Sequence, residues 1–215
     1  MAAGRRIREP RQARALATRE RLIAAAAELL GEVGVERLST NLICARAGVT
    51  PPAFYRYFRD KYAALEELGE RLMEAQNQVI APLLERRHLV VSEADLRGLI
   101  LGTIRVTQQF PGGAWVLRAL RAVPALQHVR LRSHRRMSAL IAKAARKDRK
   151  TSARQALEAR LLIDMGYAAI ELAFDEPGLK PAGIAEEAAP SLTVLAKAIL
   201  RARQVDNRQQ RREKA

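Results

Sequence analysis

The chain has 215 residues, with 38 Lys and Arg against 23 Asp and Glu, which gives a formal net charge of +15 and a pI of about 11.0. A hydrophobic share of 48% can build a core, which excludes a mainly disordered protein. The N-terminus has no apolar run of signal-peptide length, and no stretch approaches the roughly 18 apolar residues of a membrane span. We therefore expect a cytoplasmic protein without membrane association.

The residue types favour helices throughout the chain. Aromatic residues make up only 4%, Gly and Pro are few, and Ala, Leu, Arg and Glu are abundant. These abundant residues lose little rotamer freedom in a helix. We expect an all-α fold of about nine helices.

The first 17 residues are rich in Arg and lack a sustained apolar face, which predicts a flexible basic arm. It could reach into a DNA minor groove or be a solvated tail. Thr18 is the predicted N-cap of a first helix that reaches Val33, and Gly34 is its predicted stop.

Two short helices are predicted next, and together they form a helix-turn-helix. One begins at Ser39 or Thr40 and ends at Arg46 before Gly48, and the other runs from Pro51 to about Phe58. Four apolar residues lock the two helices at a fixed angle: Ile43, Ala47, Val49 and Phe54.

The remaining helices follow from apolar spacing and capping signals. They are predicted from Asp60 to about Leu83, then at 92–110, 114–123, 124–147, 151–174 and from about 184, with a loop at 175–183. The capping box of the helix at 92–110 consists of Ser92 and Asp95.

The outer face of the second short helix could enter a DNA major groove. It presents hydroxyls and Arg, which suit phosphates and base edges, together with apolar groups that suit a thymine methyl. The residues on or beside this face are Thr50, Pro51, Pro52, Ala53, Tyr55, Arg56 and Tyr57.

The N-terminal third resembles the DNA-binding domain of the TetR family of transcriptional regulators. The resemblance rests on residues 18–65: Thr18-Arg-x-x-Leu-Ile-x-x-Ala26, Gly34, Thr40-x-x-Ile43, Ala47-Gly48-Val49-Thr50 and Phe54-Tyr55-Arg56-Tyr57-Phe58-x-Asp60-Lys61-x-x-x-Leu65. It implies phosphate contacts from Thr40, Tyr55 and Lys61, and base-facing positions for Asn41, Pro51, Pro52, Ala53 and Arg56.

Three residues depart from the family pattern. Cys44 stands where Ala is usual, Pro51 where Lys or Arg is frequent, and Pro52 where Gly is frequent. The prolines remove hydrogen-bond donors, so we expect base readout to depend on Arg56 and Asn41, with a larger share from DNA shape. Cys44 is either a small core residue or a redox-sensitive thiol.

The resemblance also implies a larger ligand-binding and dimerisation domain. We expect an arm at 1–17, the DNA-binding domain at 18–65, this second domain at 66–204 and a polar basic tail at 205–215. Residues that could close a mainly apolar effector pocket, or simply form core, are Thr103, Val106, Thr107, Phe110, Trp115, Met137, Ile141, Met165 and Tyr167.

A homodimer is expected because each recognition helix reads only a few base pairs. Its predicted interface, again by resemblance, comprises Leu157, Leu161, Ala168, Leu172, Leu192, Leu195 and Ile199. Asp164 interrupts an apolar helix, so it either pairs with an Arg or faces a ligand or a second subunit.

Positive charge is concentrated outside the helix-turn-helix. Residues 118–160 hold 13 basic and 2 acidic side chains. Arg132, Arg135, Lys143, Arg146 and Lys150 lie near one face of the predicted helix at 124–147. A solvated stripe explains them, and DNA flanks or an acidic partner are the alternatives.

Enzymatic sites are not indicated. His88, His128 and His134 lack metal-ligand spacing, Cys44 has no evident His partner, and no phosphate-binding Gly loop is present. We expect no catalysis, no metal and no cofactor.

The sequence thus predicts a repressor that a small, mainly hydrophobic effector releases from a palindromic operator in double-stranded DNA. One alternative is an effector-independent architectural DNA-binding protein. The other is an enzyme or carrier on a helical scaffold.

Overall fold

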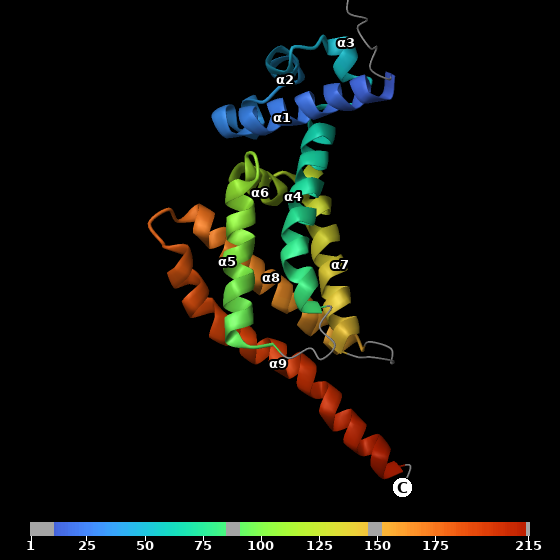
Figure 1. Ribbon diagram of the computed structural model, residues 1–215, viewed down its shortest axis with the longest axis vertical. Helices are drawn as coiled ribbons and strands as arrows, with labels where there is room; N and C mark the ends of the chain where they lie inside the picture. The colour runs from blue at the N-terminus through green and yellow to red at the C-terminus, as the bar shows by residue number, and fades with distance from the viewer. Residues whose placement is uncertain (1–10, 85–90, 146–151, 214–215) are drawn as a thin grey trace, which may run out of the picture. The chain divides into compact units, whose positions relative to one another are not determined.

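The structure is a computed structural model that describes residues 11–84, 91–145 and 152–213 (Figure 1). Within these ranges the regular secondary structure consists of nine α-helices and one short 3₁₀ helix, so the predicted all-α fold is confirmed. The chain forms two compact units. The first unit comprises residues up to 69 together with 111–126, and the second comprises 70–110 and the residues from 127 onward.

The first unit contains the N-terminal helices and one helix from later in the chain. They are α1 (Arg11–Arg37), α2 (Thr40–Ala47), α3 (Pro51–Phe54), the start of α4 (Lys61–Leu84) and α6 (Gly113–Ala122). Figure 1 shows α2 and α3 lying against α1. The predicted division at residue 66 assigned α6 to the second domain, whereas its contacts place it with α1.

Helix α1 begins earlier than predicted. It starts at Arg11, and the Thr18 hydroxyl donates to the backbone oxygen of Arg14 at 2.9 Å, so Thr18 is inside the helix and the prediction of an N-cap there is wrong. The reason is that residues 11–17 are rich in Ala, Leu and Arg, which are strong helix formers. The predicted arm is therefore helical from residue 11, and residues 1–10 lie outside the described part.

The core of the first unit is a set of fully buried apolar side chains. Gly34 has a φ of 73° and interrupts α1, as the sequence predicts. Large, fully buried side chains come from helices α1 to α4 and from α6: Leu22, Leu30, Ile43, Phe54, Leu65, Leu68, Leu117 and Leu120. This packing fixes the orientation of α2 and α3.

The second unit consists of α5 (Glu93–Gln109), α7 (Gln127–Ala145), α8 (Ala153–Asp175) and α9 (Pro181–Glu213), with the remainder of α4. Helices α5 and α8 pack on α9, and α7 packs on α8. The core between α5, α8 and α9 includes Ile100, Ile104, Ile170, Leu192 and Ala196.

Several helix ends match their capping signals. The Ala63 amide donates to Asp60 Oδ1 at 2.8 Å, and Ser92 and Asp95 form the predicted capping box. Ser152 caps α8 in a second box with Gln155, while Thr151, the alternative cap, lies outside the described residues.

Three predicted boundaries need correction. Helix α9 starts at Pro181 and not near residue 184, because Pro is well suited to the first helical turn. It extends to Glu213, so residues 205–213 of the predicted tail are helical. Residues Pro124–Leu126 form the 3₁₀ helix η1 ahead of α7. Among the described helices, none combines the length and apolarity that membrane crossing requires.

Candidate functional site

Helices α2 and α3 form the predicted helix-turn-helix. The Ser39 hydroxyl caps α2 by accepting from the Leu42 amide at 3.2 Å. Gly48 ends α2 with a φ of 64°, a left-handed conformation that costs Gly little, and the Val49 amide donates to the backbone oxygen of Cys44 at 3.0 Å. The turn between the helices is therefore set by local backbone geometry.

Helix α3 is short, and its two prolines stand at the positions where an amide donor is not needed. The Phe54 amide donates to the backbone oxygen of Thr50 at 3.2 Å, and the Phe58 amide to that of Phe54 at 3.0 Å, so helical hydrogen bonding continues in the turn after Phe54. The Phe54 ring is fully buried and packs edge-on to Tyr55 with centroids 5.6 Å apart. Phe54 thus anchors α3 while its other face remains exposed.

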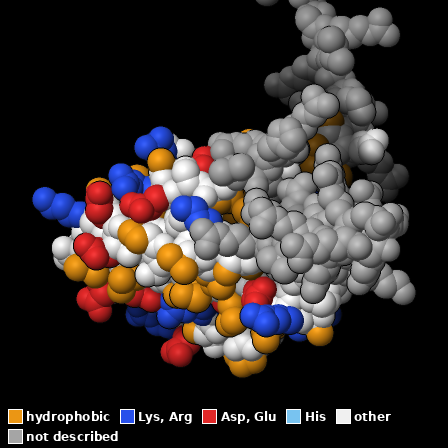
Figure 2. All heavy atoms as spheres, turned by 90° about the horizontal axis from the view of Figure 1, so that it is seen from below, with side chains coloured by type: hydrophobic (Ala, Val, Ile, Leu, Met, Phe, Trp, Pro, Cys, Tyr) orange, Lys and Arg blue, Asp and Glu red, His pale blue; other side chains and the backbone are white. Residues whose placement is uncertain are grey.

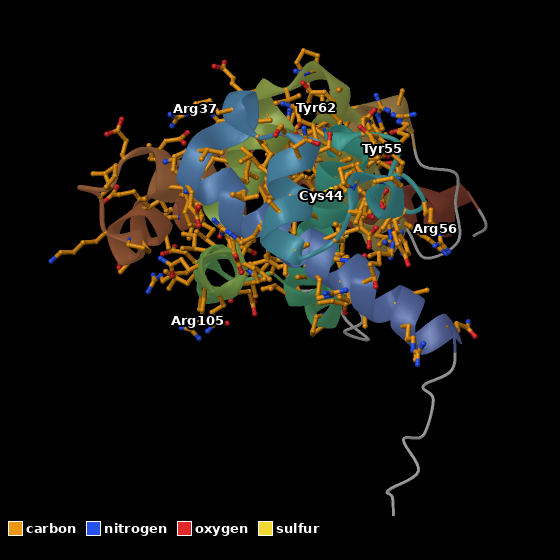
Figure 3. All side chains as sticks on the ribbon, turned by 90° about the horizontal axis from the view of Figure 1, so that it is seen from above. Arg37, Cys44, Tyr55, Arg56, Tyr62 and Arg105 are labelled. Atoms are coloured by element: carbon orange, nitrogen blue, oxygen red, sulfur yellow. The ribbon has the colours of Figure 1, made fainter. Side chains whose placement is uncertain are left out.

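Most of the predicted DNA-contacting residues of α2, α3 and the turn after α3 are exposed to solvent. Tyr55 is 57% exposed, and Figure 3 places Tyr55 and Arg56 at α3, with Cys44 among the packed helices. The exposed members are Asn41, Thr50, Pro51, Pro52, Tyr55 and Arg56, and the half-buried members are Thr40, Ala53 and Tyr57. Hydroxyl, amide and guanidinium groups of α2, α3 and the following turn are therefore accessible to solvent.

Lys61, the predicted phosphate ligand at the start of α4, has a second set of partners. Its Nζ donates to the backbone oxygens of Val35 and Leu38, both at 2.8 Å. These carbonyls belong to the end of α1 and the segment before α2, where intrahelical partners run out. Lys61 thus ties α4 to the α1–α2 corner, an interaction that sequence spacing did not indicate.

A buttress formed by Arg46, Glu28 and Glu32 joins α2 to α1. Arg46 Nη2 contacts Glu32 Oε2 at 2.7 Å and Arg46 Nη1 contacts Glu28 Oε2 at 3.1 Å. The hydrogen bond from Arg46 holds the pKa of Glu32 below its usual range. Arg21 adds a bond to the backbone oxygen of Ala47 at 3.3 Å. Residues far apart in the sequence form this buttress, which is why the spacing within each helix did not reveal it.

Cys44 is 2% exposed at the α1–α2 contact. Burial raises the pKa of its thiol, which keeps the thiol protonated near neutral pH. This environment favours the interpretation of Cys44 as a small core residue.

An apolar cavity of about 90 Å³ lies within the second unit. It is lined mainly by aliphatic side chains of α4, α5, α7, α8 and α9, and none of the described residues that line it is charged. Three residues of the predicted pocket line it: Thr103, Ile141 and Tyr167. Among the described lining residues, Thr103 and Tyr167 are the ones with a side-chain polar atom.

The other predicted pocket residues do not line this cavity. Thr107 and Met137 are buried nearby in the same unit, whereas Val106 and Phe110 are half-buried. The Trp115 side chain belongs to the first unit and packs at Gly31 of α1, so its assignment to this pocket is wrong. Met165 is also wrongly assigned, because it points outward and is 46% exposed.

A buried chain of hydrogen bonds borders the cavity. Tyr167 Oη donates to Gln76 Oε1 at 3.2 Å, Gln76 Nε2 donates to Thr107 Oγ1 at 2.7 Å, and Thr107 Oγ1 donates to the backbone oxygen of Thr103 at 2.8 Å. Burial raises the pKa of Tyr167 far above its usual value, so its hydroxyl stays neutral. Gln76 was absent from the predicted site because a single polar residue on an amphipathic helix gives no distinctive signal.

Asp164 is paired with an Arg, as one of the sequence alternatives proposed. Its Oδ2 contacts Arg160 Nε and its Oδ1 contacts His134 Nδ1, both at 2.6 Å. The His134 side chain is fully buried, stacks on Tyr167 with centroids 4.1 Å apart, and its Nε2 is buried without a partner. Burial lowers the pKa of His134, which outweighs the opposing effect of Asp164.

The carboxylate of Asp164 responds to opposing influences. Burial alone would raise its pKa, but the hydrogen bonds from Arg160 and His134 hold the pKa below the usual value. Asp164 is therefore ionised and His134 neutral near pH 7. In that state Nδ1–H of His134 donates to Asp164, and Nε2 carries a lone pair.

Some residues of the predicted dimer surface are exposed and others are buried within the subunit. An exposed apolar stripe on α8 contains Leu157, Leu161, Ala168 and Leu172, and Met165 continues it. On α9, Leu192 and Ile199 are 4% and 1% exposed and line the cavity, so the prediction that they contact a second copy is wrong. Leu195 is half-buried.

The basic side chains of α7 are partly neutralised. Arg132 pairs with Glu70 at 2.6 Å and Arg136 pairs with Glu74 at 2.9 Å, both on α4. On the face in Figure 2, acidic and basic side chains are interspersed among apolar ones over the described residues. Arg135 and Lys143 are exposed, and Arg146 and Lys150 lie outside the described part.

The described residues contain no group of three or more His, Cys, Asp or Glu side chains that could hold a metal ion. His128 is exposed on α7, and His88 lies outside the described ranges.

Residues 22–68 match the family described as bacterial regulatory proteins, tetR family. Over 88 residues the chain is 34% identical to the class A tetracycline repressor protein of transposon 1721 from Escherichia coli, covering 41% of this chain. The match spans only 37% of that relative's length. Over 55 residues the chain is 44% identical to the class C tetracycline repressor protein of the same organism, covering 26% of this chain and 25% of that relative.

Solved structures resemble the chain over most of its length. A tetR-family transcriptional regulator from Streptomyces coelicolor aligns with a TM-score of 0.63 at 19% identity, over 88% of this chain and 89% of the other. The SmeT–triclosan complex aligns with a TM-score of 0.60 at 22% identity, over 88% and 91%. These likenesses establish the fold, and the match at residues 22–68 shows that the N-terminal part of the chain contains a helix-turn-helix domain of the tetR type.

Proposed function

We propose that the protein is a homodimeric repressor that binds a palindromic operator and is released by a small, mainly hydrophobic effector. The observation that supports the DNA-binding part is that the predicted contact residues Thr50, Pro51, Pro52, Tyr55 and Arg56 are exposed, while Phe54 between them is buried. Hydroxyl and guanidinium groups on such a face suit phosphates and base edges.

Base readout on this surface rests on Arg56 and Asn41. Both are exposed, and an Arg guanidinium can bind a guanine edge in bidentate fashion. Pro52 and half-buried Ala53 supply apolar contact for a thymine methyl. We expect Thr40, Thr50, Tyr55 and Tyr57 to contact phosphates, and the resemblance adds Lys61 at the start of α4.

The effector part of the proposal rests on the apolar cavity in the second unit. Helix α4 begins in the first unit at Lys61 and ends in the second at Leu84, where Leu83 and Leu84 line the cavity. A ligand shifts DNA affinity only if it binds one form of the protein better than the other. Helix α4 follows α3 in the chain and reaches the cavity, so a ligand in the cavity could change the position of α3 through α4.

The second subunit is expected on the exposed α8 stripe. A row of exposed Leu and Met side chains at helical spacing is suited to burial against an identical row. Two recognition helices about 34–36 Å apart would then read successive major grooves.

Selection of bound fragments from random DNA tests the proposal. We expect a palindromic site, protected in footprinting by the wild-type protein. The Arg56→Ala variant should lose about 10- to 100-fold in affinity for that site and become less selective at one position in each half-site, since a bidentate base contact discriminates by about 1–3 kcal/mol. Arg37→Ala removes the same charge at the end of α1 and serves as the matched control.

The competing hypothesis is an architectural protein that binds DNA of any sequence through its basic segments. It predicts the same steep salt dependence on any DNA and no protected palindrome. Unchanged affinity and selectivity in Arg56→Ala, or equal binding to operator and random DNA, contradicts the proposal.

A further inference from the structure

Lys61 has a full set of hydrogen-bond acceptors inside the first unit. Its Nζ donates to the backbone oxygens of Val35 and Leu38, each at 2.8 Å, and to that of Glu36 at 3.5 Å. An ammonium group has three N–H donors, so the three oxygens match the donors in number. The Tyr62 ring lies against the same Nζ, with its centroid 5.2 Å away. The half-buried side chain of Lys61 is thereby held at the end of α1.

The amide end of α4 also has an internal partner. The Ala63 amide donates to Asp60 Oδ1 at 2.8 Å, and Arg59 Nε lies 3.4 Å from Asp60 Oδ2. The N-terminus of a helix attracts an anion, and here the Asp60 carboxylate takes that place. Two groups at the start of α4 that suit a phosphate, the Lys61 ammonium and the Ala63 amide, are therefore engaged within the chain.

Transfer of the Lys61 ammonium to a DNA phosphate would take a charged donor away from three backbone oxygens. These oxygens belong to the end of α1 and the segment before α2. Hydrogen bonds from a charged donor are stronger than neutral ones, and a phosphate at the protein surface would replace three of them with a contact open to water. We therefore expect Lys61 to keep its internal partners when the protein binds DNA.

Lys61 also closes the segment that carries Arg56. Residues 55–60 form the whole connection between α3 and α4. Phe54 is fully buried before this connection, and within it Phe58 is 4% exposed, with its ring 5.5 Å from that of Phe54. Because the connection is short, a displaced start of α4 would displace Arg56 as well.

We propose that Lys61 is a positioning residue for base readout and not a phosphate ligand. By tying the start of α4 to the α1–α2 corner, it fixes the connection that presents Arg56 to a base edge. This role deepens the proposed function and rests on it, because it requires an operator that Arg56 reads. It differs from the role that the resemblance implies, since backbone oxygens of the α1–α2 corner take the place of the phosphate.

The test compares binding to the selected operator with binding to random DNA of the same length. A phosphate contact contributes to both, since every sequence has phosphates, whereas the position of Arg56 affects mainly the operator. Dissociation constants of the full-length protein are measured for both DNAs between about 50 and 200 mM salt. Titration at DNA concentrations far above the dissociation constant gives the active fraction, so unfolded protein is not counted as weaker binding.

Lys61→Arg separates the two roles most sharply. It keeps the positive charge and supplies a good phosphate ligand, but a planar guanidinium does not direct three donors from one nitrogen as the ammonium does. A positioning role predicts that the ratio of operator affinity to random-DNA affinity falls about tenfold, the size of one lost base contact. A phosphate ligand would leave this ratio at the wild-type value.

Lys61→Met removes the ammonium group altogether. Operator affinity should again fall about tenfold, while the salt slope on random DNA stays the same; a lost phosphate contact would lower that slope by about 0.9 in each subunit. Arg59→Met is the matched control, because it removes the same charge from a 79% exposed side chain in the same connection. It should leave the operator-to-random ratio unchanged.

Failure of this inference is distinguishable from failure of the proposed function. With a selected operator in hand, a wild-type ratio in Lys61→Arg, equal losses on both DNAs in Lys61→Met, or a lower salt slope in Lys61→Met overturns the positioning role alone. A wild-type protein that selects no operator from random DNA removes the proposed function, and the positioning role falls with it.

Discussion

Lys61 is expected to stabilise the first unit in the absence of DNA. Its ammonium group donates to the backbone oxygens of Val35 and Leu38 at 2.8 Å and lies 3.5 Å from that of Glu36. Replacement by Met keeps the length and apolar stem of the side chain and removes the three donors. The carbonyls at the α1–α2 corner then lose their shared partner.

The size of the effect follows from the two short bonds. Hydrogen bonds to a charged group contribute about 1.5–3 kcal/mol each, and the half-buried position of Lys61 lets water replace part of this. We therefore expect Lys61→Met to lower the free energy of unfolding of the first unit by about 2 kcal/mol in total. For a chain of this size that corresponds to a decrease of roughly 4–8 °C in Tm.

The single Trp makes the measurement specific to this unit. Trp115 lies on α6 in the same unit as Lys61, so its fluorescence during urea unfolding reports on that unit. Lys197→Met, at an exposed position on α9, removes the same charge and should leave the Trp115 transition unchanged. A midpoint for Lys61→Met equal to that of wild type would refute the structural role of Lys61.

Three further outcomes are expected. In urea unfolding, Gly112→Ala should lower the free energy of unfolding by about 2 kcal/mol or more, because φ is 66° and the new Cβ would lie 2.7 Å from a carbonyl oxygen of α1. Gly98→Ala in α5 places its Cβ in open space and should raise the free energy of unfolding by about 0.5–1 kcal/mol. Leu161→Glu in the exposed α8 stripe should convert a dimer to a monomer in light scattering, while Leu179→Glu in the loop before α9 should not. Because burial lowers the pKa of His134, the unfolded state binds its proton first as the pH falls through about 6.5. The free energy of unfolding should therefore decrease from pH 7 to pH 5, by less than about 1.4 kcal/mol per pH unit. His134→Gln should make this pH dependence weaker. An equal pH dependence in the variant would contradict the assignment of the effect to His134.

The sequence by itself determined most of the helices and the helix-turn-helix segment. Apolar spacing predicted the helices, and local signals fixed many of their ends, such as the Ser92–Asp95 box and the stop at Gly48. These signals suffice because a cap or a left-handed Gly acts within a few residues of itself. The start of α1 was missed because Thr18, a good cap, stands within a run of strong helix formers.

Tertiary structure decided which side chains meet. The apolar spacing of α9 made Leu192 and Ile199 equally suitable for a core and for a dimer surface, and only the packing of α5 and α8 onto α9 buried them. The hydrogen bond of Gln76 to Tyr167 spans 91 residues, so no local pattern could reveal it. Periodicity identifies the apolar face of a helix, but what that face contacts depends on its partners in space. The polarity of the cavity therefore could be read only from the tertiary structure.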